Sequence, residues 1–324
     1  MIPSCITLSN SHSCSAHVAR APADNVNSLL SGFHFSLESL NAMDQQLMST
    51  GVPLLILGLG WTGTFLNELL SQLHITYVAT TRHQTTDTVQ WELPQDDSCT
   101  HVDVSALPQA KTVLVTFPVR SSACMSSLMD AYESKHGQTQ WILLSSTRPF
   151  SGNPSDRHGP IDPSKDTSGR MEGEAVILER GGTVLHLAGL WGAQRQPRNW
   201  VPRFATQQAI RGKLLARQLH LIHGNDVARA IVAAHKHFQK GQRWIVTDGG
   251  CYDWIQLFLA WGSEEQIEMA RDLAKNDDAC RQALGSGSLE EIVARGGVRP
   301  RLDSRDFWNT FQLEPTEFLH ICKS

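Results

Sequence analysis

The stretch of sequence that decides the fold runs from Pro53 to Gly63 and reads PLLILGLGWTG. Its first five residues are apolar, which predicts a buried strand. Glycines at positions 58, 60 and 63 then give the spacing G-x-G-x-x-G, and the chain from Trp61 to Leu73 has apolar residues at helical spacing. A strand, a glycine-rich turn and a helix in this order are typical of a turn that holds phosphate groups against a helix N-terminus.

Each glycine of this turn has a separate steric role. Gly58 permits the tight turn, Gly60 lets a pyrophosphate approach the backbone, and Gly63 lets the helix pack closely on the strand. We therefore predict a dinucleotide site whose cofactor contacts come from five residues: Gly58, Gly60, Trp61, Thr62 and Gly63. A glycine-rich turn without a ligand is the alternative, and the sequence leaves it open.

The end of the next strand indicates which dinucleotide fits. An Asp or Glu there would bind the ribose 2′-hydroxyl of NAD, but the chain from Val78 to His83 reads VATTRH and has no acid. Arg82 can pair with a 2′-phosphate, and Thr81 can donate a hydrogen bond to it. We therefore expect NADP(H) rather than NAD(H). The alternative is that Arg82 is a solvated charge at the strand end.

Short apolar runs alternate with amphipathic stretches along the rest of the chain. Strands are predicted at 75–80, 112–116, 141–144, 183–187, 219–222 and 243–247, and helices at 121–134, 169–180 and 225–237. This alternation predicts an α/β fold with a doubly wound parallel Rossmann sheet. We place the nucleotide-binding Rossmann domain at 51–248 and a small, mostly helical C-terminal substrate lobe at 249–324, to which 191–217 contribute.

Composition excludes several classes of function. The 324 residues are 41% hydrophobic and 19% charged, which is ordinary for a soluble globular protein. A net charge of −4 provides no basic field for nucleic acid, and the longest clean apolar run is too short to span a membrane. The seven cysteines form no C-x-x-C pair, so we expect reduced thiols and no metal site.

Residues 1–50 differ from the rest of the chain. They are rich in Ser and Asn, and Arg20 is the only Lys or Arg before position 82. We expect a loosely structured tail and a cytoplasmic protein. A transit peptide for a plastid or another organelle is the alternative, because the first part of the tail has few acids. Met43 is a second candidate start, just before the first strand.

Four further segments resemble one family in the correct order. They are LLSST at 143–147, GTVLHLAGLWG at 182–192, LIHGNDVA at 221–228 and the closing stretch at 301–318. Together with the glycine turn, they resemble the extended, epimerase/dehydratase-like branch of the short-chain dehydrogenase/reductase superfamily over residues 52–320. The resemblance implies a nicotinamide dinucleotide, a small-molecule substrate, and a hydroxyl of Ser146 or Thr147 that polarises the substrate. Plain capping of a turn is the alternative for these hydroxyls.

The catalytic Tyr-x-x-x-Lys pair of that family is missing at the matching position. Alignment on Glu174 puts Asp166 at the Tyr position and Arg170 at the Lys position, and the three tyrosines lie elsewhere. In this respect the chain resembles the atypical, YeeZ-like members of the superfamily. Arg170 can still contact ribose or phosphate oxygens, and Asp166 could accept a proton in a buried setting. Capping of the following helix is the alternative for Asp166.

Two other groups of polar residues lie further along the chain. Arg195 and Arg198 lie where the substrate lobe of the extended family begins, and we predict that they bind an anionic substrate. A solvated surface loop is the alternative for this pair. Asn225 or Asp226 is expected to cap the helix that follows, with His223 packed beneath the substrate loop.

These expectations leave two functions open. The first is an NADP(H)-binding oxidoreductase or epimerase-like enzyme that acts on a small substrate, with catalytic roles for Ser146, Thr147, Asp166 and Arg170. The second is a catalytically inactive dinucleotide-binding sensor or interaction protein, which the missing Tyr-Lys pair favours. A homodimer is left open for both.

Overall fold

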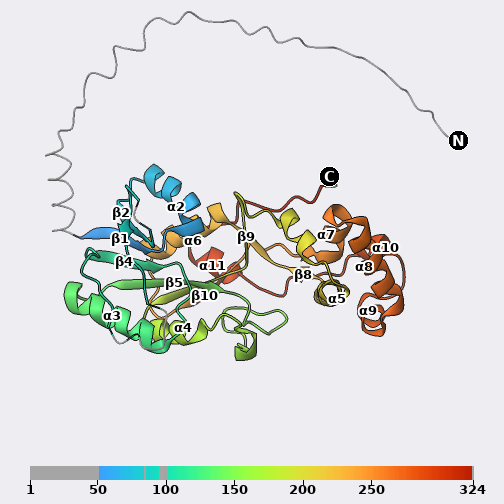
Figure 1. Ribbon diagram of the computed structural model, residues 1–324, viewed down its shortest axis with the longest axis horizontal. Helices are drawn as coiled ribbons and strands as arrows, with labels where there is room; N and C mark the ends of the chain where they lie inside the picture. Colours follow the sequence, from blue (N-terminus) through green and yellow to red (C-terminus); the bar gives the residue numbers. More distant parts are fainter. Residues whose placement is uncertain (1–50, 84, 95–98, 100, 323–324) are drawn as a thin grey trace, which may run out of the picture. The chain divides into compact units, whose positions relative to one another are not determined.

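The computed structural model describes residues 51–83, 85–94, 99 and 101–322. The predicted N-terminal tail and Met43 lie outside these residues. The central layer is a seven-stranded sheet in which every neighbouring pair of strands is parallel (Figure 1). In spatial order its strands are β10 (Arg243–Val246), β6 (Thr183–Leu187), β5 (Gln140–Ser146), β4 (Ala110–Val115), β1 (Val52–Leu57), β2 (Tyr77–Thr81) and β3 (Val89–Gln90).

Strand β1 explains why the sheet is buried on both faces. Leu54 and Ile56 belong to one hydrophobic cluster, whereas Leu55 and Leu57 belong to a second one. Successive side chains of a strand point to opposite faces, so an uninterrupted apolar run is stable only in a sheet that is covered on both sides. The continuous apolar pattern of this strand therefore requires helices on both faces of the sheet.

Helices cover the two faces in two groups (Figure 1). α2 (Gly60–Gln72), α6 (Gly224–Lys236) and α11 (Arg305–Thr310) lie on one face and contribute to the first cluster. α3 (Ser122–His136) and α4 (Met171–Glu179) lie on the other face and contribute to the second. This is the doubly wound Rossmann arrangement that the alternating pattern predicts, so the predicted fold class is confirmed.

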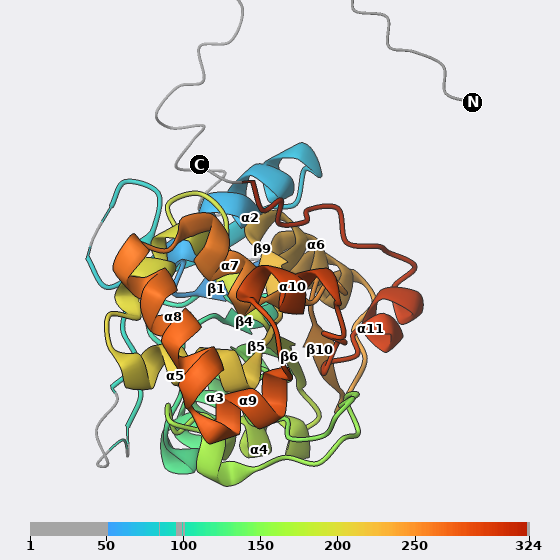
Figure 2. The same ribbon diagram turned by 90° about the vertical axis from the view of Figure 1, so that its right-hand side faces the viewer.

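A third hydrophobic cluster joins a group of helices that lie together in Figure 2. Its buried residues include Trp254 and Phe258. Val201, which precedes the last strand of the sheet in the sequence, also belongs to it. The helices are α5 (Gln207–Ala216), α7 (Trp254–Trp261), α8 (Glu264–Asn276), α9 (Asp278–Leu284) and α10 (Leu289–Ala294). The C-terminal part is therefore mostly helical, while the predicted boundary at 248 stays a prediction.

The segment 219–222, predicted as a single strand, belongs to two strands with different partners. β8 (Gln218–Leu219) pairs antiparallel with β11 (Tyr252–Asp253), and β9 (Leu221–His223) pairs parallel with β7 (Gly189–Trp191). His220 lies between the two strands, and its carbonyl accepts the N–H of Gly189 over 3.0 Å. Partners that are distant in the sequence decide this division, so the local pattern could not reveal it.

Candidate functional site

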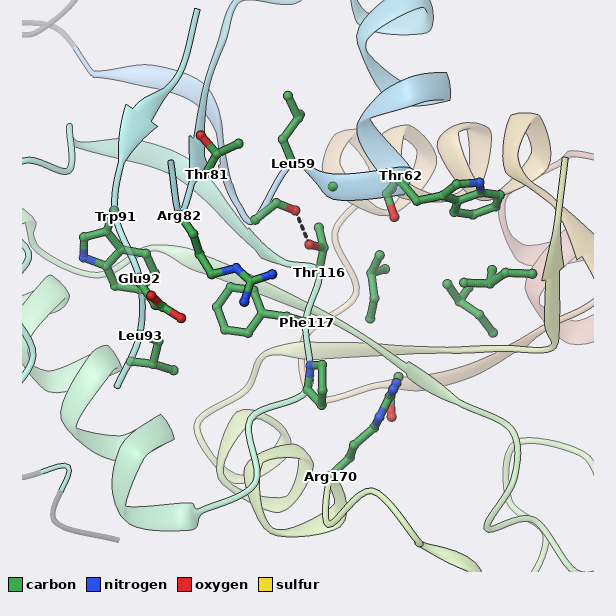
Figure 3. Close-up of a pocket in the computed structure, with 18 of the residues that line it drawn as sticks. Leu59, Thr62, Thr81, Arg82, Trp91, Glu92, Leu93, Thr116, Phe117 and Arg170 are labelled. Carbon is green, nitrogen blue, oxygen red and sulfur yellow. Dashed lines mark hydrogen bonds between the residues drawn. The ribbon is translucent and has the colours of Figure 1, made fainter. Parts of the chain in front are cut away.

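The glycine turn connects β1 to α2 and is tied to two neighbouring strands. The N–H of Gly58 donates to Thr80 Oγ1 over 3.0 Å, and the N–H of Leu59 donates to the Thr80 carbonyl over 2.9 Å. The Thr116 hydroxyl donates to the Gly58 carbonyl (Figure 3). Gly58 has φ = 84°, and a Cβ there would lie 2.7 Å from the Phe117 ring. Both backbone conformation and space therefore require glycine at this position.

Gly60 and Gly63 differ in their surroundings. A Cβ on Gly63 would lie 2.4 Å from the Leu59 side chain, whereas a Cβ on Gly60 would meet no atom within 4 Å. The hydrogen-bond ladder of α2 starts with the Gly63 N–H, which donates to the Leu59 carbonyl over 2.7 Å. The N–H groups of Gly60, Trp61 and Thr62 therefore precede the ladder and are open to an external acceptor. Among the described residues, α2 has no side-chain cap and no acid in its first turn, which suits a bound anion.

A cleft of about 820 Å³ opens beside this turn (Figure 3). Its walls come from the carboxyl ends of β1, β2, β4, β5 and β6, where open α/β sheets bind ligands. Most of the residues predicted to bind a cofactor line it, namely Gly58, Gly60, Trp61, Thr62, Thr81, Arg82 and Arg170. Gly63 does not line the cleft and serves the close packing described above.

The lining of the cleft is positively charged. Among the residues that the structure describes, four arginines line it, Arg82, Arg120, Arg170 and Arg195, against one carboxylate, that of Glu92. In Figure 3, Arg82 and Arg170 enter from different walls of the cleft. Cations spread along a cleft favour an elongated ligand that carries more than one anionic group.

The Thr81 hydroxyl is engaged within its own loop. It donates to the His83 carbonyl over 2.7 Å and lies 2.6 Å from the Thr88 hydroxyl. A hydroxyl has one proton to donate, so in this geometry Thr81 has none left for a ligand phosphate. Of the two donors predicted at the end of β2, Arg82 is therefore the one that remains.

Strands β5 and β6 and helix α4 bring together three polar residues to which the sequence assigned no joint role. The Ser145 hydroxyl donates to Glu174 Oε1, and Glu174 Oε2 lies 3.7 Å from His186 Nε2. His186 Nδ1 lies 3.1 Å from the Ser146 carbonyl. The side chains of Ser145, Glu174 and His186 are all buried, and Ser145 also lines the cleft. Each of the three residues lies in or beside a segment used for the resemblance, but nothing in the sequence showed that they meet.

Burial decides the protonation of this network. Because a carbonyl only accepts, His186 Nδ1 carries the proton in its bond to Ser146, and the Nε2 atom faces Glu174. Burial raises the pKa of Glu174, against the opposing effect of the hydrogen bond from Ser145. Burial also lowers the pKa of His186 to about 4. Burial thus favours the neutral form of both groups, which for Glu174 is the protonated carboxyl group.

Asp166 and Arg170 lie at the start of α4, beside a second cavity of about 100 Å³. The Asp166 carboxylate accepts hydrogen bonds from the Met171 N–H at 2.8 Å and the Ser168 hydroxyl at 3.0 Å, so it caps the helix. Burial lowers the pKa of Arg170, whereas the nearby carboxylates of Glu174 and Asp166 raise it. The Arg170 Nε atom is buried and has no hydrogen-bond partner among the described residues. Its guanidinium is therefore available to a ligand in either cavity.

The other four predicted residues lie in different places. Ser146 lines the second cavity, and Arg195 lines the main cleft. Thr147 is buried, its N–H donates to the Leu187 carbonyl, and it lines neither cavity. Arg198 is exposed and also lines neither cavity. The two arginines predicted to bind substrate together are therefore separated by the structure.

The prediction that Asn225 or Asp226 caps α6 is wrong. His223 occupies the N-cap position, and its Nδ1 accepts the N–H of Asn225 over 3.2 Å. Asp226 is buried, and its carboxylate accepts the N–H groups of Thr316 at 2.9 Å and Glu317 at 3.0 Å. The Asp226 carboxylate thus binds the distant C-terminal segment and does not cap the helix, although its position in the sequence suits a cap.

Two further kinds of site are absent from the described part of the chain. None of its helices combines the length and the apolar character that a membrane span needs. No group of three or more His, Cys, Asp or Glu side chains within it is arranged to hold a metal ion. The cleft and the small cavity beside it are the candidate sites, because most of the predicted site residues line them.

Comparison with known proteins gives structural neighbours at low sequence identity. No model of a protein family matches the sequence, and no curated protein matches it either. A short-chain dehydrogenase/reductase superfamily protein from Agrobacterium tumefaciens, solved with bound NAD, is 15% identical with a TM-score of 0.54. That match covers 82% of this chain and 93% of the other.

Two neighbours act on sugar nucleotides according to their names. The dTDP-glucose 4,6-dehydratase from Bacillus anthracis, in complex with NAD, is 12% identical with a TM-score of 0.52, over 82% of this chain and 91% of that one. The UDP-N-acetylglucosamine 4-epimerase from Bacillus cereus is 12% identical with a TM-score of 0.51, over 82% of this chain and 95% of that one. The chain thus shares the Rossmann fold of these three solved proteins.

Proposed function

We propose that the chain is an atypical extended short-chain dehydrogenase that binds NADP(H) and acts on a small molecule as an oxidoreductase or epimerase-like enzyme. The observation that carries the proposal is the uncapped start of α2 at Gly60, on the wall of a cleft of about 820 Å³. The free space where a Cβ of Gly60 would lie is what a pyrophosphate needs to reach the backbone N–H groups. The residues present therefore fit a dinucleotide.

Arg82 supports the preference for NADP(H) over NAD(H). It lines the cleft at the end of β2, where Rossmann sites bind the ribose of the adenosine half. An acid at this position would bind the ribose hydroxyl of NAD, and Arg82 would instead pair with a 2′-phosphate. Thr81 adds no donor, because its hydroxyl bonds within the loop.

A bound nicotinamide dinucleotide would supply a hydride donor or acceptor. The residues of the chain then have separate tasks: α2 and Arg82 bind phosphates, and Arg170 contacts ribose or phosphate oxygens. Of Ser145, Ser146 and Thr147, only Ser145 lines the main cleft. Burial raises the pKa of Glu174 behind it, which favours the protonated carboxyl group. A protonated Glu174 can donate to the Ser145 Oγ atom, which leaves the Ser145 proton for a substrate. We therefore assign to Ser145 the polarising role that the sequence suggested for Ser146 or Thr147.

The test is a titration of the full chain with NADPH and with NADH. Energy transfer from tryptophan to the reduced nicotinamide reports binding, and Trp61 lies on the cleft wall. We expect saturable binding of NADPH, about tenfold tighter than binding of NADH, because one charge-assisted contact is at stake. No binding of either dinucleotide would refute the proposal. Equal affinity would leave the dinucleotide site but remove the preference for NADP(H).

A second function is favoured by the start of α4. Asp166 stands at the family's Tyr position, and its carboxylate is used to cap the helix. A chain without a proton donor there would bind NADP(H) as a sensor or interaction protein. The two functions are separated by following NADPH absorbance with panels of aldehydes, ketones and sugar nucleotides. Oxidation that is lost in Ser145→Ala supports the enzyme, and tight binding without oxidation supports the sensor.

A further inference from the structure

The loop that follows β7 folds into a tight hairpin. Gly192 and Arg195 exchange two backbone hydrogen bonds of 3.0 Å, which close a two-residue turn that begins with Ala193. Ala193 has φ = 49°, a left-handed conformation that costs a non-glycine residue about 1–2 kcal/mol. The surrounding structure holds the backbone in this conformation, which fixes the point from which the Arg195 side chain extends.

Arg195 extends back to the glycine turn and lies over Trp61. Its Cζ atom is 4.5 Å from the centroid of the indole ring. A guanidinium above an aromatic face is attracted by the ring and keeps its N–H donors free to bind an anion. Within the described residues, no carboxylate forms an ion pair with Arg195.

A row of aromatic rings connects the hairpin to helix α2. The ring centroids are 4.9 Å apart for Trp61 and Phe65, 5.3 Å for Phe65 and His223, and 4.5 Å for His223 and Trp191. Gly192 fits closely at the end of this row, because a Cβ there would lie 2.4 Å from His223 Nε2. The packing fixes the hairpin relative to the start of α2, so the place of Arg195 beside the glycine turn is built into the fold.

We propose that Arg195 binds the dinucleotide and not the substrate. The N–H groups of Trp61 and Thr62 precede the hydrogen-bond ladder of α2 and are the proposed donors to the pyrophosphate, and Arg195 rests on the side chain of Trp61. Arg195 therefore holds the same pyrophosphate with a charged donor from a separate loop. This inference rests on the proposed function and adds a residue to its cofactor site. Arg198, three residues further on, lines neither cavity and takes no part.

The experiment measures the affinity of three probes for the full chain and its variants. NADPH and 2′-phospho-ADP-ribose carry a pyrophosphate, whereas adenosine 2′-monophosphate carries only the 2′-phosphate. We expect Arg195→Ala to weaken binding of the first two by about tenfold or more and to change the third by less than about twofold. Arg198→Ala is the matched control, and we expect it to leave all three affinities unchanged.

Two further variants keep the test decisive. Arg195→Gln keeps the length of the side chain without its charge, and it replaces the alanine variant if thermal unfolding shows that the latter is misfolded. Unchanged NADPH affinity in either variant overturns the inference, as does an equal loss for adenosine 2′-monophosphate. Arg82→Ala should instead weaken the binding of all three probes, because each of them carries a 2′-phosphate. If the wild-type chain binds neither NADPH nor NADH, the proposed function itself fails.

Discussion

The two ends of the cleft differ in how closely they follow the pattern of the dehydrogenase family that the sequence resembles. At the glycine turn, Gly58, Gly60 and Gly63 each have the surroundings that their position in the motif requires. At the start of α4, Asp166 and Arg170 stand where that family has its catalytic tyrosine and lysine. One end therefore has the features of a phosphate-binding turn, whereas the other lacks the Tyr and Lys side chains of that family.

This difference shows that binding and chemistry depend on different parts of the fold. The glycine turn acts through backbone N–H groups and the helix dipole, and these are fixed once strand, turn and helix are packed. Proton transfer needs particular side chains at particular positions, and these can be exchanged without loss of the sheet. At this second end, the polar side chains buried behind the cleft are those of Ser145, Glu174 and His186.

The largest effect is expected at the first end, for Gly60→Ala. A methyl group there meets no protein atom, but it would occupy the space through which a pyrophosphate approaches. We expect NADPH affinity to fall about a hundredfold, because hydrogen bonds to a charged group are each worth about 1.5–3 kcal/mol. The free energy of unfolding should fall by only about 1–2 kcal/mol, from the left-handed backbone. Isothermal calorimetry and urea unfolding measure the two quantities, and unaltered affinity would contradict a phosphate-binding turn.

A smaller effect is expected for Arg82→Ala, which tests the specificity of the same end. NADPH affinity should fall about tenfold, because a charge-assisted hydrogen bond to the 2′-phosphate is lost. NADH affinity should change by less than about twofold, since NADH has no such phosphate. Arg198→Ala is the control for the loss of one positive charge near the cleft. Equal losses of affinity for NADPH and NADH would show that Arg82 does not bind the 2′-phosphate.

The second end is tested by the pH dependence of stability in Glu174→Gln. Burial raises the pKa of Glu174 in the folded chain above its value in the unfolded chain. The stability that Glu174 contributes is therefore fully present below the unfolded pKa, and it is lost as pH rises through the folded pKa. The amide that replaces the carboxyl group cannot ionise, so we expect the variant to gain stability relative to wild type as pH rises. Urea unfolding from acidic to mildly alkaline pH measures this difference.

Glu172→Gln is the matched control for this experiment, because it removes an exposed carboxylate from the same first turn of α4. We expect no comparable gain with rising pH in this variant. Parallel stability curves for wild type and Glu174→Gln would show that Glu174 is ionised in the folded chain. In that case Glu174 would not carry the proton that we assign to it beside the cleft.

The smallest effect on binding is expected for Thr81→Val. Its hydroxyl bonds to the His83 carbonyl and to Thr88, so the variant should lose about 1 kcal/mol of stability. NADPH affinity should change by less than about threefold. A tenfold loss of NADPH affinity with NADH affinity intact would instead restore Thr81 as a donor to the 2′-phosphate.

Local patterns predicted those features that depend on neighbours in the sequence. The apolar run before Gly58 predicted a strand buried on both faces, and β1 contributes to both hydrophobic clusters. The glycine spacing predicted the turn into α2, and the missing acid after β2 pointed to Arg82 on the cleft wall. Predicted helix and strand limits differ from the observed ones by a few residues, because end residues depend on caps and packing.

Features that join distant segments were not visible in the sequence. Asp226 reads as a helix cap, but the segment at Thr316 and Glu317 takes its carboxylate. Arg195 and Arg198 read as one pair, but the Gly192 hairpin directs only the first toward the cleft. Ser145 reads as part of a strand end, and its link to Glu174 appears only when β5 and α4 pack together.

The sequence by itself determined the alternating α/β order, the glycine turn and the lack of the Tyr-Lys pair, since each depends only on residues that are adjacent or regularly spaced in the chain. The tertiary structure alone decided which charges share the cleft and which carboxyl group is buried beside it. Such groups meet across segments far apart in the chain, and both burial and electrostatic interaction depend on distance in space.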